Sequence, residues 1–178
     1  MTLKSIVFGK DGITTDLSPY EFDLVNFQKE YCYNYHRQKL FNSLLECKSE
    51  FATSGVRTEE FWIGGSFVDI GRQSPNDIDV MLMLRLLNKP DSLESFKKET
   101  QRLETLPKIK AVNTSREVDF TCLWLQKHPL INARHVAHWT NLYSFNRESP
   151  ETRRAILIVK PVALRATPRH VSGYGQND

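Results

Sequence analysis

The sequence predicts an α/β (α+β) domain in which helices flank a mixed β-sheet. Segments typical of strands alternate with segments of helical period, in the order strand, helix, strand, helix, strand, helix, strand. Such alternation is typical of helices packed on a sheet. The chain has 178 residues, of which 40% are hydrophobic and 25% charged, as in ordinary soluble globular domains. We expect a single domain over residues 1–164 and a flexible basic, polar tail over residues 165–178.

The first predicted elements are an extended opening and a long helix. Residues 4–15 predict an extended segment with a turn at GKDG, because Gly and Asp favour turn conformations. Residues 17–51 predict a helix, and a break within it stays open. Ser18 is the expected N-cap, with Pro19 at the first helical position and Glu21 completing a capping box.

The middle of the chain predicts two strands around a glycine turn. FWIGG (61–65) is expected to be a strand that runs into the turn, and SFVDIGR (66–72) a short helix beginning at Ser66. NDIDVMLML (76–84) is expected to be the next strand. The later elements are a helix over 91–106 capped by Asp91 or Ser92, a strand over 116–125, a helix over 132–145, and a strand or short helix over 153–164.

Composition argues against a membrane or secreted protein. The longest apolar runs are short, such as AILIV (155–159), so no segment is expected to span a bilayer. The N-terminus lacks the apolar stretch and cleavage site of a secretory signal. Three cysteines without CxxC spacing favour reduced thiols, and hence a cytoplasmic protein.

The formal net charge of +3 is unevenly placed. Residues 147–178 carry six Lys or Arg against three Asp or Glu, and the other residues carry 18 of each. This basic C-terminal portion could approach phosphates, or could serve only solubility; both interpretations stay open.

Asp77 and Asp79 are unusual because they lie in an otherwise apolar stretch. Residues two apart on a strand project from the same face, with Cα atoms about 6.6 Å apart. Two neighbouring carboxylates repel unless a cation or protons lie between them. Oxygen ligands of this kind suit Mg²⁺, and Asp119 on the strand at 116–125 offers a third. Each aspartate taken alone could instead cap a turn or lie on the surface.

The glycines before these aspartates predict a phosphate site. Gly64 and Gly65 lie between a strand and a helix, so the backbone can approach a ligand closely. Backbone N–H groups at such a turn favour anions, here a triphosphate, and the Ser66 hydroxyl adds a donor.

Gly65-Ser66, ten further residues and Asp77-x-Asp79 resemble the GS-x10-D-x-D signature of minimal nucleotidyltransferases of the DNA polymerase β superfamily. Asp119 falls where that superfamily has its third carboxylate. GGSFVDIGRQSPNDIDV, with the flanks IVFGKDGITT and LYSFNRES…AILIV, also resembles an uncharacterised group of bacterial and phage-borne nucleotidyltransferase-like proteins. That likeness covers most of residues 5–160. Asp69 departs from it, since the group tends to have Thr there.

The resemblance implies a nucleotidyltransferase fold and a metal-dependent reaction. Asp77 and Asp79 would bridge two Mg²⁺ (or Mn²⁺) ions, and Asp119 would bind the one that activates the acceptor. The NTP would lay its triphosphate on the Gly64–Ser66 turn, and Arg72 would contact a phosphate or the acceptor. The implied acceptor is a hydroxyl of RNA (tRNA) or protein, in a toxin–antitoxin or phage-defence setting, or else a hydroxyl of a small molecule, which the small size of the chain disfavours.

Other interpretations stay open. The chain could be a catalytically silent module that binds a nucleotide or a protein partner, as an antitoxin does. Trp124, Trp139 and Tyr143 could stack on a base, although core packing is the better expectation for Trp124. His128, His135 and His138 are expected to be surface or packing residues rather than a zinc site.

Overall fold

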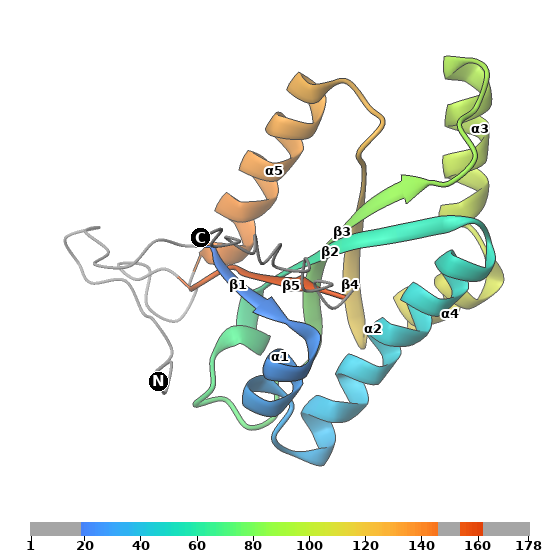
Figure 1. Ribbon diagram of the computed structural model, residues 1–178. Coiled ribbons are helices and arrows are strands. Elements are labelled where there is room, and N and C mark those ends of the chain that lie inside the picture. Colours follow the sequence, from blue (N-terminus) through green and yellow to red (C-terminus); the bar gives the residue numbers. More distant parts are fainter. Residues whose placement is uncertain (1–18, 146–153, 162–178) are drawn as a thin grey trace, which may run out of the picture.

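The computed structural model describes residues 19–145 and 154–161, and these form a mixed sheet with helices on both faces (Figure 1). Five strands pair in the order β1-β5-β2-β3-β4. The prediction of a mixed sheet flanked by helices is therefore confirmed. The strands are β1 (Tyr20–Asp23), β2 (Val56–Gly64), β3 (Ile78–Leu86), β4 (Val118–Trp124) and β5 (Leu157–Lys160). The helices are α1 (Leu24–Tyr31), α2 (Tyr35–Thr53), α3 (Leu93–Glu104), α4 (Pro107–Ser115) and α5 (Pro129–Ser144), and the 3₁₀ turn η1 spans Gly65–Val68.

The centre of the sheet combines both kinds of pairing. β2 runs antiparallel to β3 and to β5, whereas β3 and β4 are parallel. The parallel pair needs a long crossover, and α3 and α4 supply it. β2 therefore ends, and β3 and β4 begin, at the same end of the sheet.

Strand alternation divides the buried side chains between two cores. Ile78, Val80 and Leu82 of β3 belong to the larger core, which lies on the side of α1, α2 and α4. Met81 and Met83 point the other way, into a smaller cluster beneath α5 that includes Trp139 and Leu123. Even-numbered residues of β3 thus face the large core, and odd-numbered ones face α5.

The predicted start of the first helix is wrong. Residues Tyr20–Asp23 form a strand, so Glu21 lies in β1 and completes no capping box. The helix begins at Leu24, where Asp23 is the N-cap and accepts from the Asn26 backbone N–H at 2.8 Å. β1 pairs in parallel with β5, near the other end of the described chain. Local helix signals cannot detect such a distant partner, and the pairing overrides them.

The rest of the predicted helix at 17–51 is helical, but it is divided into two helices. α1 ends at Tyr31, and α2 begins at Tyr35 after the N-cap Asn34.

The helix expected after the glycine turn is only η1. Ser92, one of the two expected caps, accepts from the Ser95 N–H at the start of α3. β5 settles the open choice at 153–164 as a strand. α4 was not predicted, and the expected opening at 4–15, Ser18 and the expected tail lie outside the described residues.

Within residues 19–145 and 154–161, no helix has the length and apolar character needed to cross a membrane.

Candidate active site

Asp79 and Asp119 meet at the start of the parallel strand pair. They are register partners on β3 and β4, which places their Cα atoms about 4.8 Å apart. Both are odd-numbered residues of strands whose odd-numbered side chains face α5. Asp77 lies just before β3, half-buried, and its carboxyl feels the charge of Asp119. The structure therefore brings the three predicted aspartates to one end of the sheet, and we call them the carboxylate site.

The glycine turn lies against the carboxylate site. Gly64, the last residue of β2, is the register partner of Asp79. Gly65 has φ +64°, and a Cβ there would lie 1.6 Å from Oδ2 of Asp79. No side chain fits at this position, and the backbone angle independently favours glycine. The Asp79 carboxylate therefore touches the backbone of the turn that was predicted to hold phosphates.

Tyr143 is a residue of this site. Its hydroxyl donates a hydrogen bond to Oδ2 of Asp119 over 3.1 Å. A Cβ added at Gly64 would lie 3.0 Å from Cβ of Tyr143, so the tyrosine also packs beside the glycine turn. The sequence offered only a base-stacking interpretation of Tyr143. A signal was present, since Trp139 and Tyr143 are four apart on α5 and share one helix face.

Burial and the charges of the carboxylates shift the pKa of two groups here, Asp77 and Tyr143. Burial raises the pKa of Asp77, and the charge of Asp119 raises it further, whereas the charge of Arg72 opposes the rise. Burial also raises the pKa of Tyr143, together with the charges of all three aspartates and the hydrogen bond to Asp119. The three carboxylates and Tyr143 therefore form one electrostatic cluster. Arg72, which the sequence analysis singled out, lies close enough to affect the pKa of Asp77.

The donor chemistry of the site fits Mg²⁺ or Mn²⁺. Three carboxylates, one of them with a raised pKa, present negative charge that a hard divalent cation would neutralise. Across the residues that the structure describes, no set of three or more His, Cys, Asp or Glu side chains is placed so that it could hold a metal ion. The third carboxylate, Asp119, accepts a hydrogen bond from the Tyr143 hydroxyl. The residue types thus suit the cation, but to bind it Asp119 would have to lose this hydrogen bond or keep it beside the metal contact.

The segment after the glycine turn closes on itself. η1 is only four residues long, and Ser66 within it is half-buried. The Asp69 carboxylate accepts from the backbone N–H of Gly71 at 2.9 Å, which closes a turn of the kind that Asp favours. The unexpected acid at position 69 therefore has a local structural role.

A second group of residues that sequence analysis missed holds the loop between η1 and Asp77. Side chains from the start of α2 and the residues before it donate hydrogen bonds to backbone carbonyls of residues 67–75. We call this group the loop clamp. Its bonds run from Tyr33 Oη to Ile70 O (2.8 Å), from Asn34 Nδ2 to Gln73 O (2.8 Å), from His36 Nε2 to Pro75 O (2.6 Å), and from Arg37 to Phe67 O and Arg72 O (2.7 Å).

Arg37 is the buried centre of the loop clamp. Its side chain has no exposed surface, and its Nε also donates to the carbonyl of Tyr31 at 2.5 Å. The guanidinium carbon lies 4.3 Å from the centre of the Phe67 ring. Burial lowers the pKa of Arg37, but a guanidinium stays protonated in proteins. Burying a charged group costs free energy unless it is hydrogen-bonded, and the loop carbonyls supply those hydrogen bonds to Arg37.

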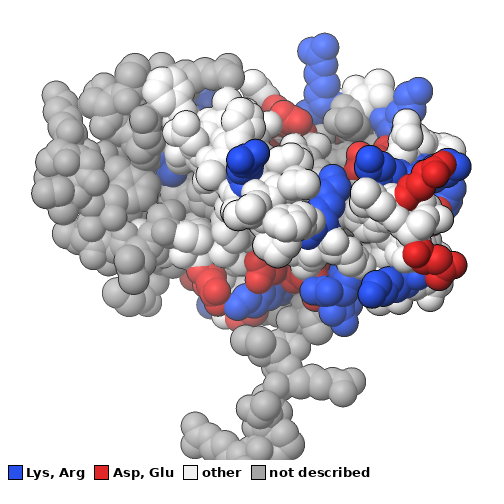
Figure 2. Space-filling view, turned by 90° about the horizontal axis from the view of Figure 1, so that it is seen from above, with Lys and Arg blue, Asp and Glu red and all other residues white. Residues whose placement is uncertain are grey.

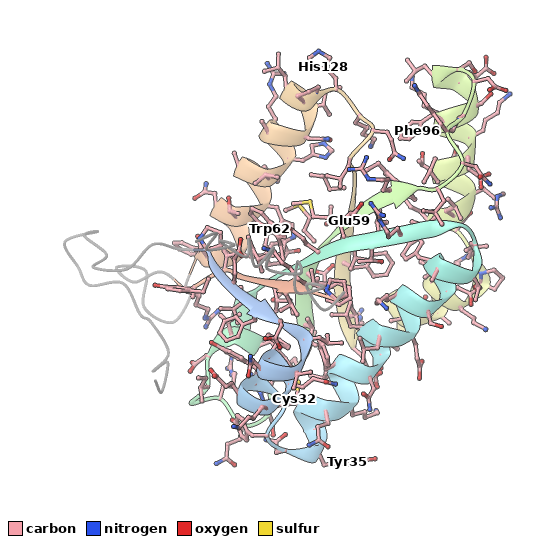
Figure 3. All side chains as sticks on the ribbon, viewed as in Figure 1. Cys32, Tyr35, Glu59, Trp62, Phe96 and His128 are labelled. Carbon is pink, nitrogen blue, oxygen red and sulfur yellow. The ribbon has the colours of Figure 1, made fainter. Side chains whose placement is uncertain are left out.

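The other aromatic and histidine candidates lie away from the carboxylates or in the cores. Trp124 is fully buried, donates to Glu104 Oε1 at 2.6 Å, and packs edge-on against Phe51 and Phe96, which confirms core packing. Trp139 is the residue of α5 that is buried in the smaller core, where its ring contacts that of Tyr143. His128 caps the start of α5, at the opposite end of that helix from Tyr143 (Figure 3).

The described surface seen from the α5 side carries both signs of charge. Figure 2 shows Lys and Arg interspersed with Asp and Glu among uncharged side chains. Most of the basic C-terminal portion, 147–178, lies outside the described residues. The described part of this face therefore shows no uniform basic surface of the kind that favours nucleic-acid backbones.

Comparison with known proteins returned one family. A family model described as "Family of unknown function (DUF6932)" matches residues 7–160, which is most of the chain. Neither the curated proteins nor the solved structures gave a match.

Proposed function

This chain belongs to the DUF6932 family of unknown function, and we propose that it is a metal-dependent nucleotidyltransferase. It would transfer a nucleoside monophosphate from an NTP to an acceptor hydroxyl. One observation carries the proposal: Asp79 is the register partner of both Gly64 and Asp119. A turn suited to phosphates and two carboxylates thus lie side by side on three adjacent strand ends.

Each predicted residue has a role in this proposal. The backbone of Gly64 and Gly65 would bind the β- and γ-phosphates through N–H groups, with the Ser66 hydroxyl as a further donor. Arg72, whose charge acts on Asp77, would contact a phosphate or the acceptor. The loop clamp would keep Arg72 and Asp77 in place relative to the turn.

The carboxylates would carry the chemistry. Asp77, Asp79 and Asp119 would hold Mg²⁺ or Mn²⁺. When bound, such ions stabilise the charge that develops on the α-phosphate and on the leaving pyrophosphate. Asp119 would orient the acceptor and accept its proton. It is the most exposed of the three carboxylates and already accepts a hydrogen bond from a hydroxyl group.

The acceptor class follows from the resemblance and not from the described surface. We propose a hydroxyl of RNA (tRNA) or of a protein, in a cytoplasmic toxin–antitoxin or phage-defence setting. The mixed charge in Figure 2 does not favour RNA over protein among the described residues.

A direct transfer assay tests the proposal. The protein is incubated with each α-³²P-labelled NTP, Mg²⁺ or Mn²⁺, and separate pools of total tRNA and lysate protein. We expect label in one pool from the wild type and from Asp91→Asn, a control that removes an exposed carboxylate beyond the other end of β3. Asp79→Asn and the double variant Asp77→Ala/Asp79→Ala should transfer none. Transfer retained by Asp79→Asn would refute the carboxylate assignment.

A second candidate is a catalytically silent nucleotide- or partner-binding module. The Tyr143–Asp119 hydrogen bond favours it, because that bond engages the third carboxylate. Mg²⁺-dependent nucleotide binding without pyrophosphate release, over every pool, is the result that distinguishes this candidate from the transferase.

A further inference from the structure

The hydroxyl of Tyr143 lies beside Asp119, the position that the proposed reaction gives to its acceptor. It donates to Oδ2 of Asp119 over 3.1 Å, the hydrogen-bond reach that a general base requires. Its side chain begins beside Gly64, the first residue of the proposed phosphate turn. Tyr143 therefore lies between the proposed base and the proposed phosphate site, on the α5 face that both share.

The tyrosine is held there by packing. The rings of Tyr143 and Trp139 lie 4.7 Å apart and are tilted by 36°. Trp139 is buried in the smaller core together with Met81 and Ile156. A ring fixed on a buried tryptophan presents its hydroxyl at one place, and such restricted geometry favours attack on a bound group.

Tyr33 and Tyr35, two other tyrosines of the described residues, lie elsewhere. The Tyr33 hydroxyl donates to the carbonyl of Ile70, and Tyr35 is 81% exposed at the start of α2 (Figure 3). An outside acceptor that uses Oδ2 of Asp119 would have to displace the Tyr143 hydroxyl from it.

We propose that Tyr143 is an acceptor of the reaction, so that the protein nucleotidylates itself on this residue. The inference rests on the proposed function. The Tyr143 oxygen would attack the α-phosphorus of the bound NTP, forming a tyrosyl O–P bond. The bond from the α-phosphorus to the bridging oxygen breaks, pyrophosphate leaves, and the phenolic proton passes to Asp119.

Peptide mapping of the wild-type chain tests this inference. The full-length protein is incubated with Mg²⁺ and each of the four NTPs, digested, and analysed by mass spectrometry. We expect one nucleoside monophosphate on the peptide that carries Tyr143. α-³²P labelling of the chain should be lost in Tyr143→Phe and in Asp79→Asn, and kept in Tyr35→Phe. The mapping on wild-type protein needs no variant, so it decides the question even if Tyr143→Phe folds poorly.

The outcomes separate this inference from the function on which it rests. Transfer to RNA or protein pools without modification of Tyr143 would overturn the inference and leave the proposed function standing. In that case, increased transfer by Tyr143→Phe would show that the tyrosine blocks the acceptor position. Label on the chain that persists in Tyr143→Phe would also overturn it. Transfer to neither pool nor chain would refute both proposals.

Discussion

Asp79 and Asp119 are register partners on the parallel strands β3 and β4, although α3 and α4 separate them in the chain. The parallel pairing makes both strands begin at the same end of the sheet. The side chains at odd-numbered positions of both strands then project towards α5, where the Tyr143 hydroxyl meets Asp119. The carboxylate site therefore depends on one sheet register, and a shift by one residue would turn the Asp79 side chain into the large core.

Replacing Gly65 with alanine should disrupt the site through a direct clash. The new Cβ would lie 1.6 Å from Asp79 Oδ2, and φ is +64°. We expect a destabilisation beyond the ~1–2 kcal/mol of a left-handed alanine, and loss of Mg²⁺-nucleotide binding. Urea unfolding and equilibrium binding measure the two effects.

Gly55→Ala is the matched control for Gly65→Ala. Gly55 has φ +79°, but a Cβ there would meet no atom within 4 Å. This variant should show the backbone cost alone and should bind nucleotide normally. Equal stability loss and equal binding in the two variants would contradict the contact between Gly65 and Asp79.

Removing the guanidinium of Arg37 should loosen the loop between η1 and β3. Arg37→Met would leave the carbonyls of Phe67 and Arg72 without their buried donor. Each buried carbonyl left without a hydrogen bond costs ~1–3 kcal/mol. We therefore expect the free energy of unfolding to fall by about 3 kcal/mol or more. Amide exchange over residues 67–75 should become faster.

Arg102→Met is the corresponding surface variant. Arg102 forms an exposed ion pair with Glu99, so its loss should change stability by no more than ~0.5 kcal/mol. If Arg37→Met cost no more than Arg102→Met, the loop clamp would not hold the loop.

Asp77→Asn should stabilise the metal-free protein at neutral pH. The folded state raises the pKa of Asp77, chiefly by burial and then by the charge of Asp119. A raised pKa favours the protonated form, so the wild type loses stability as pH rises through the folded pKa. Asparagine is neutral throughout and avoids this loss.

The advantage of Asp77→Asn should therefore shrink as pH falls through the folded pKa towards the ordinary value of 3.8. Urea unfolding in the presence of a chelator, from neutral to acid pH, measures the difference between the two proteins. A difference that stays constant with pH would show that Asp77 is not perturbed. Asp91→Asn controls for the loss of one negative charge.

Mg²⁺ with a non-hydrolysable NTP analogue should stabilise the wild type against heat. A ligand at 100 times its dissociation constant adds ~2.7 kcal/mol to the free energy of unfolding. Thermal melts with increasing analogue should show a rising midpoint, and a chelator should abolish the rise. A chelator-resistant rise would mean that the nucleotide binds without the carboxylates, and Asp79→Asn would then behave like the wild type.

Local signals in the sequence were sufficient where an element is decided by its own residues. Ser92 caps α3, and the apolar run after Asp77 forms β3, because these patterns act within a few residues. β1 was missed because its partner is β5, from near the other end of the described chain. The loop clamp was missed for a similar reason. Its donors at 33–37 and its acceptors at 67–75 meet only after α2 has packed on the sheet.

The sequence by itself determined most of the alternation of strands and helices, though neither β1 nor α4, and it determined the spacing that sets Gly65, Asp77 and Asp79 apart from an ordinary apolar strand. These features are local, so residue type and spacing are enough. Only the tertiary structure decided that Asp119 pairs with Asp79, that Arg37 holds the loop, and that the Tyr143 hydroxyl lies on Asp119. Each of these depends on strand register or helix packing, which distant parts of the chain fix together through burial.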